Sequence, residues 1–274
     1  MIVQTTTDNQ PPFVIQQNDH AKTCGDLARA FGGNGFQLPN PAELLIYAVE
    51  HHDAGWMPID ARAEQSPTTG LPHHLTQTPL PYLVQTSKGS PDFNEAHHPF
   101  SGLLSSMHTY GLFNGRYGLS DFVFIDKMSE EHRPMTMEML ENELVRQERL
   151  RKELANIPET ASWVDEPCLF THYKLLQFFD TLGLYFQMTH ADARTTTHFL
   201  NVPDASGRDH TLTITPQDNG RYHLSPYPFS TPMVKVQTVG RYLTPQPAGT
   251  DFKEIFATTP PSTQSYMIVQ ETAQ

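Results

Sequence analysis

Residues able to bind a metal interrupt the apolar faces of four separate segments: His20, the pair His52 and Asp53, His108, and Asp180. Burying an imidazole or a carboxylate costs free energy unless a partner satisfies it, and one metal ion can satisfy several such groups together. The alternative is that each residue is a core group with a hydrogen bond of its own. Because five such groups are harder to satisfy separately, we expect them to share a metal.

The donor atoms of these residues restrict the kind of metal site. The chain has only two cysteines, Cys24 and Cys168, so neither a thiolate zinc site nor a disulfide framework is expected. Imidazole and carboxylate ligands without a thiolate suit iron, manganese, zinc or nickel in an open site. The expected cofactor is therefore one or two divalent metal ions, whose identity the sequence leaves open.

A helix that starts near Asn40 is expected to position the central pair. Asn40 can cap this helix, and Pro41 suits its first position. Apolar residues up to Val49 then recur at helical spacing and share one face with His52. The geometry of a helix therefore points His52 into the core, with Asp53 beside it at the end of the helix.

Four further helices are expected from the same periodicity, over residues 19–31, 100–113, 135–154 and 166–189. His20 lies in the first turn of the first of these helices, and His108 lies among leucine and methionine in the second. Asp180 lies in the middle of the last helix, where an aspartate has poor helix propensity. Residues 57–99 are rich in proline and weakly periodic, so we expect a long irregular segment of the kind used as a lid or a binding loop.

The sequence beyond residue 195 has a different texture. Residues 211–215, 233–239 and 266–269 alternate between apolar and polar types, which predicts strands. We therefore expect a mainly α fold: a helical bundle with a small antiparallel β appendage formed by the C-terminus, which a strand within residues 1–18 could join. The predicted domains are residues 1–194, helical and metal-binding, and residues 195–274, rich in β structure.

Composition excludes some partners. The formal net charge of the 274 residues is -12, so neither a nucleic-acid backbone nor an anionic membrane surface is an expected partner. No signal peptide and no apolar run of membrane-spanning length are visible, which favours a cytoplasmic protein. The expected partner is a small-molecule substrate, and the oligomeric state is left open, with a homodimer as one option.

The order of the candidate ligands resembles the HD-domain superfamily of metal-dependent, phosphohydrolase-like helical proteins. In that family a histidine on one helix, a His-Asp pair on the next and an aspartate on a late helix bind a metal. Members with two metals carry extra histidines between the pair and the final aspartate; His108 matches one of these, and His98 is the candidate for a second. The resemblance implies an HD-domain-like helical bundle over residues 19–189, with the ligands His20, His52, Asp53, His98, His108 and Asp180.

Longer phrases are similar to an uncharacterised, mainly bacterial family known only as a domain of unknown function, which looks like a divergent HD branch. They cover residues 17–21, 52–56, 69–72, 98–100, 104–108 and 175–182, and they continue at residues 227–229 and Arg241. This similarity implies a fold but no substrate. The glycine- and proline-rich signature of cyclic-dinucleotide phosphodiesterases is absent from the sequence, which argues against that activity.

The first functional hypothesis is a metal-dependent hydrolase of the HD superfamily that acts on a phosphate ester or a related small molecule. Asp53 would hold or deprotonate the attacking water, and His51 or His108 would protonate the leaving group. Against this hypothesis, no lysine or arginine is clearly placed to neutralise a phosphate. Five basic residues are candidates by position only, and a surface charge is the favoured interpretation of each: Arg62, Lys88, Arg116, Arg149 and Lys174.

Two alternatives belong to other classes. A di-iron oxygenase of the HD type would use all six candidate ligands, with His98 as the decisive one. A metal-binding or sensory module would keep the ligands without turnover, and the proline-rich segment and the β appendage would then serve a partner. Family analogy is a weak argument for function, so an experiment has to separate the three hypotheses. Analysis of the metal content of the purified protein is the most direct one.

Overall fold

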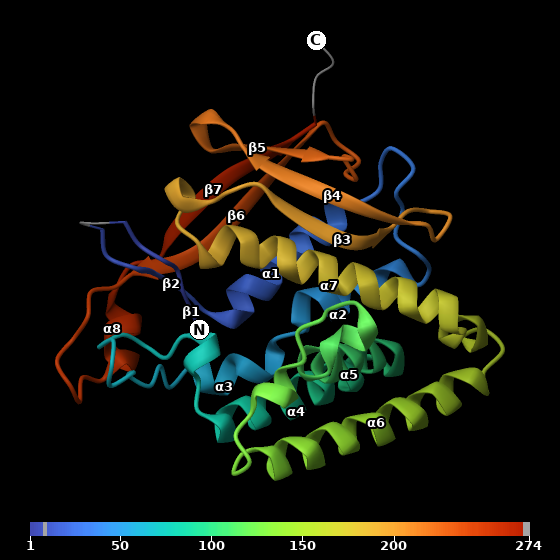
Figure 1. Ribbon diagram of the computed structural model, residues 1–274, viewed down its shortest axis with the longest axis horizontal. Helices are drawn as coiled ribbons and strands as arrows, with labels where there is room; N and C mark the ends of the chain where they lie inside the picture. The colour runs from blue at the N-terminus through green and yellow to red at the C-terminus, as the bar shows by residue number, and fades with distance from the viewer. Residues whose placement is uncertain (8–9, 271–274) are drawn as a thin grey trace.

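A seven-stranded mixed sheet covers one side of the protein in the computed structural model, which describes residues 1–7 and 10–270 (Figure 1). The strand order is β1-β2-β6-β7-β5-β4-β3, with β5 and β7 parallel and the other pairs antiparallel. The strands are β1 (Ile2–Val3), β2 (Phe13–Ile15), β3 (Thr197–Pro203), β4 (Asp209–Pro216), β5 (Arg221–Ser225), β6 (Met233–Tyr242) and β7 (Ser262–Val269).

The prediction of a mainly α fold with a small antiparallel β appendage is wrong, because the sheet is a large mixed element. β7 enters between β5 and β6, so strands far apart in the sequence become neighbours, which local alternation does not indicate. β1 and β2 extend the sheet at its other end, where β2 pairs with β6. β3 escaped prediction, and its register shifts between Phe199 and Val202, which interrupts the alternation that marks a strand.

The helices confirm most of the expected segments within a few residues. The expected helix before Asp53 ends at His51 and is followed by a short 3-10 turn, η1 (Ala54–Trp56). The helices are α1 (Gln17–Ala30), α2 (Ala42–His51), α3 (Met57–Asp60), α4 (Leu80–His97), α5 (Pro99–Phe113), α6 (Arg133–Ala155), α7 (Glu166–Met188) and α8 (Phe252–Thr258).

The prediction that residues 57–99 are irregular is wrong, because α4 occupies much of this segment. Pro91 lies inside α4, where it cannot donate a backbone hydrogen bond to the carbonyl of Ser87. Thr109 on α5 donates its hydroxyl to that carbonyl instead, at 3.3 Å. Asn94 on α4 donates its side-chain amide to the carbonyl of His51 at 2.9 Å, so this helix supports the end of α2.

Two helices, α1 and α7, lie between the sheet and the remaining helical layer of α2, α4, α5 and α6 (Figure 1). Alternate residues of β6, such as Val234 and Val236, are buried, whereas the residues between them are exposed. One core cluster joins these strand residues to Leu27 on α1 and Leu176 on α7. This cluster includes residues on both sides of position 194, and the division into domains of residues 1–194 and 195–274 remains a prediction.

No helix within residues 1–7 and 10–270 has both the length and the apolar character of a membrane span.

Candidate metal centre

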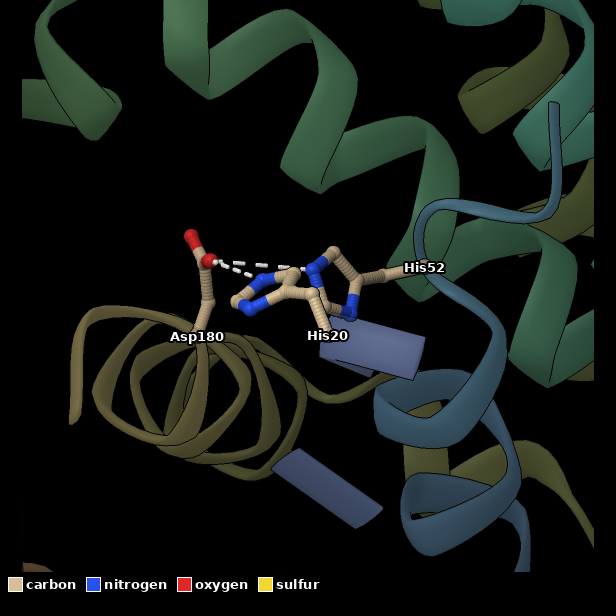
Figure 2. A group of neighbouring side chains, drawn as sticks. All are labelled: His20, His52 and Asp180. Atoms are coloured by element: carbon tan, nitrogen blue, oxygen red, sulfur yellow. Dashed lines mark hydrogen bonds and ion pairs between the residues drawn. The ribbon is translucent and has the colours of Figure 1, made fainter. Parts of the chain in front are cut away.

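The side chains of His20, His52 and Asp180, from three separate segments, meet beside α7 (Figure 2), and the carboxylate of Asp53 lies close to both imidazoles. His20 Nε2 lies 3.1 Å from Asp180 Oδ1 and 3.9 Å from Asp53 Oδ2. His52 Nε2 lies 3.5 Å from Asp53 Oδ2 and 3.6 Å from the same Asp180 oxygen. One ligand atom each of His20, His52 and Asp180 lies within 4.8 Å of the others. The structure therefore brings together four of the predicted ligands.

Local structure fixes where each side chain points. His20 lies in the first turns of α1, His52 and Asp53 follow α2, and the long α7 carries Asp180. The helices α1 and α7 approach closely because position 183 is a glycine. A Cβ at Gly183 would lie 2.5 Å from the Sγ of Cys24 and 3.3 Å from the His20 ring. Gly183 therefore permits the approach that places His20 against Asp180.

The outer nitrogen of each imidazole is committed as a hydrogen-bond donor. His52 Nδ1 donates to the carbonyl of Val49 at 2.7 Å, and His20 Nδ1 donates to the Oε1 of Gln187. A neutral imidazole with a proton on Nδ1 presents a lone pair at Nε2. Both Nε2 lone pairs therefore face carboxylate oxygens, which also only accept. Such a set of acceptors requires a cation among them, which is either a proton on an Nε2 atom, as the raised pKa of His52 allows, or a metal ion.

A divalent metal ion fits this arrangement. His52 Nε2 is buried and has no hydrogen-bond partner. Metal bonds to histidine and carboxylate are about 2.0–2.2 Å long, so neighbouring ligand atoms in one coordination shell lie roughly 3–3.5 Å apart. The separations of 3.1, 3.5 and 3.6 Å lie within or close to this range, whereas the 3.9 Å between His20 Nε2 and Asp53 Oδ2 exceeds it. The hydrogen bonds at the two Nδ1 atoms are the outer support that metal-binding histidines ordinarily have.

The pKa shifts within the cluster also favour a cation at this place. Burial disfavours ionisation of Asp180, but the hydrogen bond with His20 and the neighbouring His52 ring hold its pKa well below the ordinary value. Burial lowers the pKa of His52, but the carboxylates of Asp53 and Asp180 outweigh this and raise it to about 9. Burial raises the pKa of Asp53, although the two imidazoles oppose the change. The pocket thus stabilises positive charge between its carboxylates.

The side chain of His108 lies next to this cluster. The centroid of its ring is 5.0 Å from that of His52, and the two rings meet edge to face. Gln177 Nε2 donates to His108 Nδ1 at 2.7 Å, so the proton of a neutral His108 ring lies on Nε2. Burial lowers the pKa of His108 to about 3, so the ring is neutral. In this state His108 is a hydrogen-bond donor beside the candidate ligands.

Two other predicted site residues lie elsewhere. His51 donates Nδ1 to the carbonyl of Tyr47 at 2.9 Å, and its ring stacks on Tyr47 and Phe93. His98 caps α5 by accepting a hydrogen bond from the backbone of Phe100 at 3.0 Å.

The ring of His98 lies near that of Trp163, which precedes α7. Trp163 and His172 contact the same ring of Phe100, and His172 precedes Asp180 by roughly two turns of α7. Among the interactions of the described residues, none joins His98 or His51 to the four atoms.

Two residues that support candidate site histidines escaped the sequence analysis. Gln187 supports His20, and Gln177 supports His108. Both are buried glutamines on α7. Gln187 lies two turns after Asp180 on the same apolar stripe, which was the available signal.

Comparison with known proteins places the chain in a family without giving it an activity. The model of the family described as "Protein of unknown function (DUF3891)" matches residues 1–245. No curated protein matches the chain, and no solved structure does. Because the matched segment includes all four candidate ligands and most of the sheet, the chain belongs to the DUF3891 family of proteins of unknown function.

Proposed function

We propose that this protein is a metal-dependent hydrolase of the HD superfamily that cleaves a phosphate ester. One observation carries the proposal: in a largely buried place, the Nε2 atoms of His20 and His52 each lie 3.1–3.9 Å from a carboxylate oxygen of Asp180 and one of Asp53. A set of two histidines and two carboxylates with no thiolate suits manganese, iron, zinc or nickel. The order of the ligands supports the HD assignment: a histidine on one helix, a His-Asp pair after the next, and a late aspartate.

The residues divide the work by exposure. A divalent ion held here would polarise a phosphoryl oxygen and lower the pKa of water. Asp53 is the more accessible carboxylate, with 14% of its side chain exposed against 6% for Asp180. Asp53 therefore suits the role of holding the attacking water and accepting its proton, whereas Asp180 anchors both imidazoles.

Of the two residues expected to assist the leaving group, His108 is the better placed, as a neutral hydrogen-bond donor. Its ring packs against His52, and its Nε2 carries the proton, because Gln177 donates to Nδ1. His51 is stacked on Tyr47 and bonded to a backbone carbonyl of its own helix. His108 can therefore donate a hydrogen bond to the leaving oxygen from beside the metal ligands, whereas His51 has no comparable position.

The oxygenase alternative depends on His98. A six-ligand di-iron centre requires this residue at the cluster, but its side chain caps α5 and contacts Trp163. The hydrolase requires only the four atoms that meet, with His108 beside them. This difference favours the hydrolase.

The test starts with protein purified without chelator, whose metal content is measured. The protein is then loaded separately with manganese, iron, zinc and nickel, and hydrolysis of p-nitrophenyl phosphate is followed. We expect about one equivalent of a divalent ion and metal-dependent turnover. We expect Asp53→Ala to lose the metal or at least a hundredfold in turnover. Asp26→Ala, which removes an exposed carboxylate from α1, is the matched control and retains both.

Other outcomes support the alternatives. Bound metal without turnover of any phosphate ester favours a binding or sensory module. Two irons with consumption of dioxygen favour the oxygenase. Absence of metal after loading with each of the four ions contradicts the proposal.

A further inference from the structure

A groove with a volume of about 470 Å³ lies beside α7, between this helix, β3 and the turn η3 (Gly115–Gly118). Its apolar lining includes Leu119, Leu184 and Leu200, and Leu200 is 62% exposed. Its polar lining includes Arg116 and Gln177. A volume of this size with apolar walls and a few polar groups is typical of a site for a small organic molecule.

Arg116 differs from the other basic residues that could bind a phosphate. Arg149 pairs with Glu95 at 2.6 Å, and the amine of Lys174 binds Asp209 at 2.6 and 2.8 Å. Arg62 lies over the ring of Tyr82 and 3.9 Å from Glu64. Lys88 is exposed on α4, in a hollow that Asp92 and Glu95 also line.

Arg116 is half-buried and, among the residues that the structure describes, has no carboxylate partner. Its positive charge is therefore available to an anionic ligand.

The backbone holds Arg116 in a fixed position. All four residues of η3 have positive φ, from 51° at Arg116 to 86° at Gly118, which is a turn of left-handed helix. This conformation is costly for a residue with a Cβ and persists only where the surroundings fix it. Tyr117 supplies the anchor, because its hydroxyl donates to Gln147 at 3.0 Å and its ring packs against Tyr173. Arg116 is thus presented from a rigid turn.

The groove connects to the candidate metal centre through one side chain. Gln177 lines the groove and donates to His108 at 2.7 Å, and His108 packs against His52. A ligand anchored at Arg116 would therefore lie next to Gln177, the side chain that orients the His108 ring.

We propose that this groove is the substrate site of the hydrolase and that Arg116 binds the phosphate. The substrate class is a phosphate monoester whose apolar organic body lies along Leu119, Leu184 and Leu200. The proposal rests on the proposed function for its chemistry, but binding in the groove can be measured without turnover. The guanidinium suits a phosphate because its N–H donors match the phosphate oxygens in pairs.

Binding of phenyl phosphate to the full chain, measured by titration calorimetry, tests the proposal. We expect the wild type to bind phenyl phosphate at least tenfold more tightly than inorganic phosphate, because the apolar walls contact the ring. Arg116→Ala should weaken binding of both by about 10- to 100-fold, as expected for a lost charge-assisted hydrogen bond. Arg116→Lys should recover part of the loss, and Lys88→Ala, the matched control, should stay within twofold of wild type.

A second variant acts on the groove without touching the cation. Thr181 lines the groove from α7, and its hydroxyl bonds only to carbonyls of its own helix. Thr181→Trp fills the space, so it should weaken phenyl phosphate more than inorganic phosphate. Unchanged binding in both Arg116→Ala and Thr181→Trp overturns the proposal, as does a wild type that fails to bind phenyl phosphate.

The two proposals fail separately. If binding depends on Arg116 but the metal-loaded protein hydrolyses no phosphate ester, the groove is supported as a binding site and the hydrolase proposal is contradicted. If Arg116→Ala does not affect hydrolysis of p-nitrophenyl phosphate, the hydrolase proposal is supported and the groove is contradicted as its substrate site.

Discussion

Two buried histidines on apolar helix faces, His52 and His172, have the same local structure and different surroundings. In each, Nδ1 donates to a backbone carbonyl three or four residues earlier, Val49 for one and Cys168 for the other. Both side chains are almost completely buried. The ring of His172 lies edge to face against Phe100, whereas Nε2 of His52 faces the carboxylates of Asp53 and Asp180.

The pKa values of the two histidines are therefore shifted in opposite directions. Burial lowers the pKa of His172 to about 4, although the carbonyls of Cys168 and Pro39 oppose this change. The same burial acts on His52, but its two carboxylates raise the pKa to about 9. Burial alone thus identifies a core histidine, and acidic groups converging on the free nitrogen are what identify a candidate cation site.

The largest expected effect is on metal binding, when His52 is replaced. His52→Leu should abolish stoichiometric metal binding, a loss of at least a hundredfold in affinity, because it removes a ligand and leaves two carboxylates without a cation. His172→Leu is the matched control and should retain about one equivalent. Metal content after loading with excess manganese and gel filtration decides the matter, with far-ultraviolet circular dichroism to confirm folding. Loss of metal in both variants, or in neither, would contradict the assignment of His52 as a metal ligand and His172 as a core residue.

The candidate ligands whose burial the sequence predicted lie on helix faces or directly at a helix end. Helical periodicity specifies which residues point inward, so His20, His52 and Asp180 could be assigned to the buried side before any coordinates. His98 had no such periodicity, because it lies between α4 and α5 and serves as the cap of the latter. The side chain of a residue between two helices can point into the core or away from it, and tertiary packing determines which.

The sheet and α4 show where local reasoning fails. The position of β7 between β5 and β6 depends on long-range pairing, which no window of sequence contains. The prolines of α4 favoured an irregular segment, but Pro81 lies at the start of the helix and Thr109 satisfies the carbonyl that Pro91 leaves free. In both cases a tertiary partner outweighed a local preference.

A smaller effect is expected where the support of a ligand is removed. Gln187 fixes the His20 ring through Nδ1, so Gln187→Met should keep the fold and the four ligands but lower metal affinity about tenfold. Competition with a chromogenic chelator measures the change. Gln147→Met removes a buried glutamine of α6 that bonds to Tyr117, and it should leave metal affinity unaltered. Equal affinity in the two variants would mean that the His20 orientation does not depend on Gln187.

The smallest effect concerns His172, which is expected to act on stability and not on the metal. Its pKa is about 4 in the folded state against about 6.5 in an unfolded chain, so the unfolded state takes up the proton first. The stabilisation from a neutral His172 is complete above pH 6.5 and is lost as the pH falls towards 4. At pH 5 this loss amounts to about 2 kcal/mol.

His172→Gln cannot be protonated in this range, so its unfolding free energy should be less sensitive to pH than that of the wild type. Urea unfolding of the metal-free proteins at pH 7 and pH 5 measures the difference. The stability advantage of the wild type over the variant should shrink by about 2 kcal/mol between the two conditions. A constant advantage would mean that His172 is protonated in the folded protein, and its burial against Phe100 would then not distinguish it from His52.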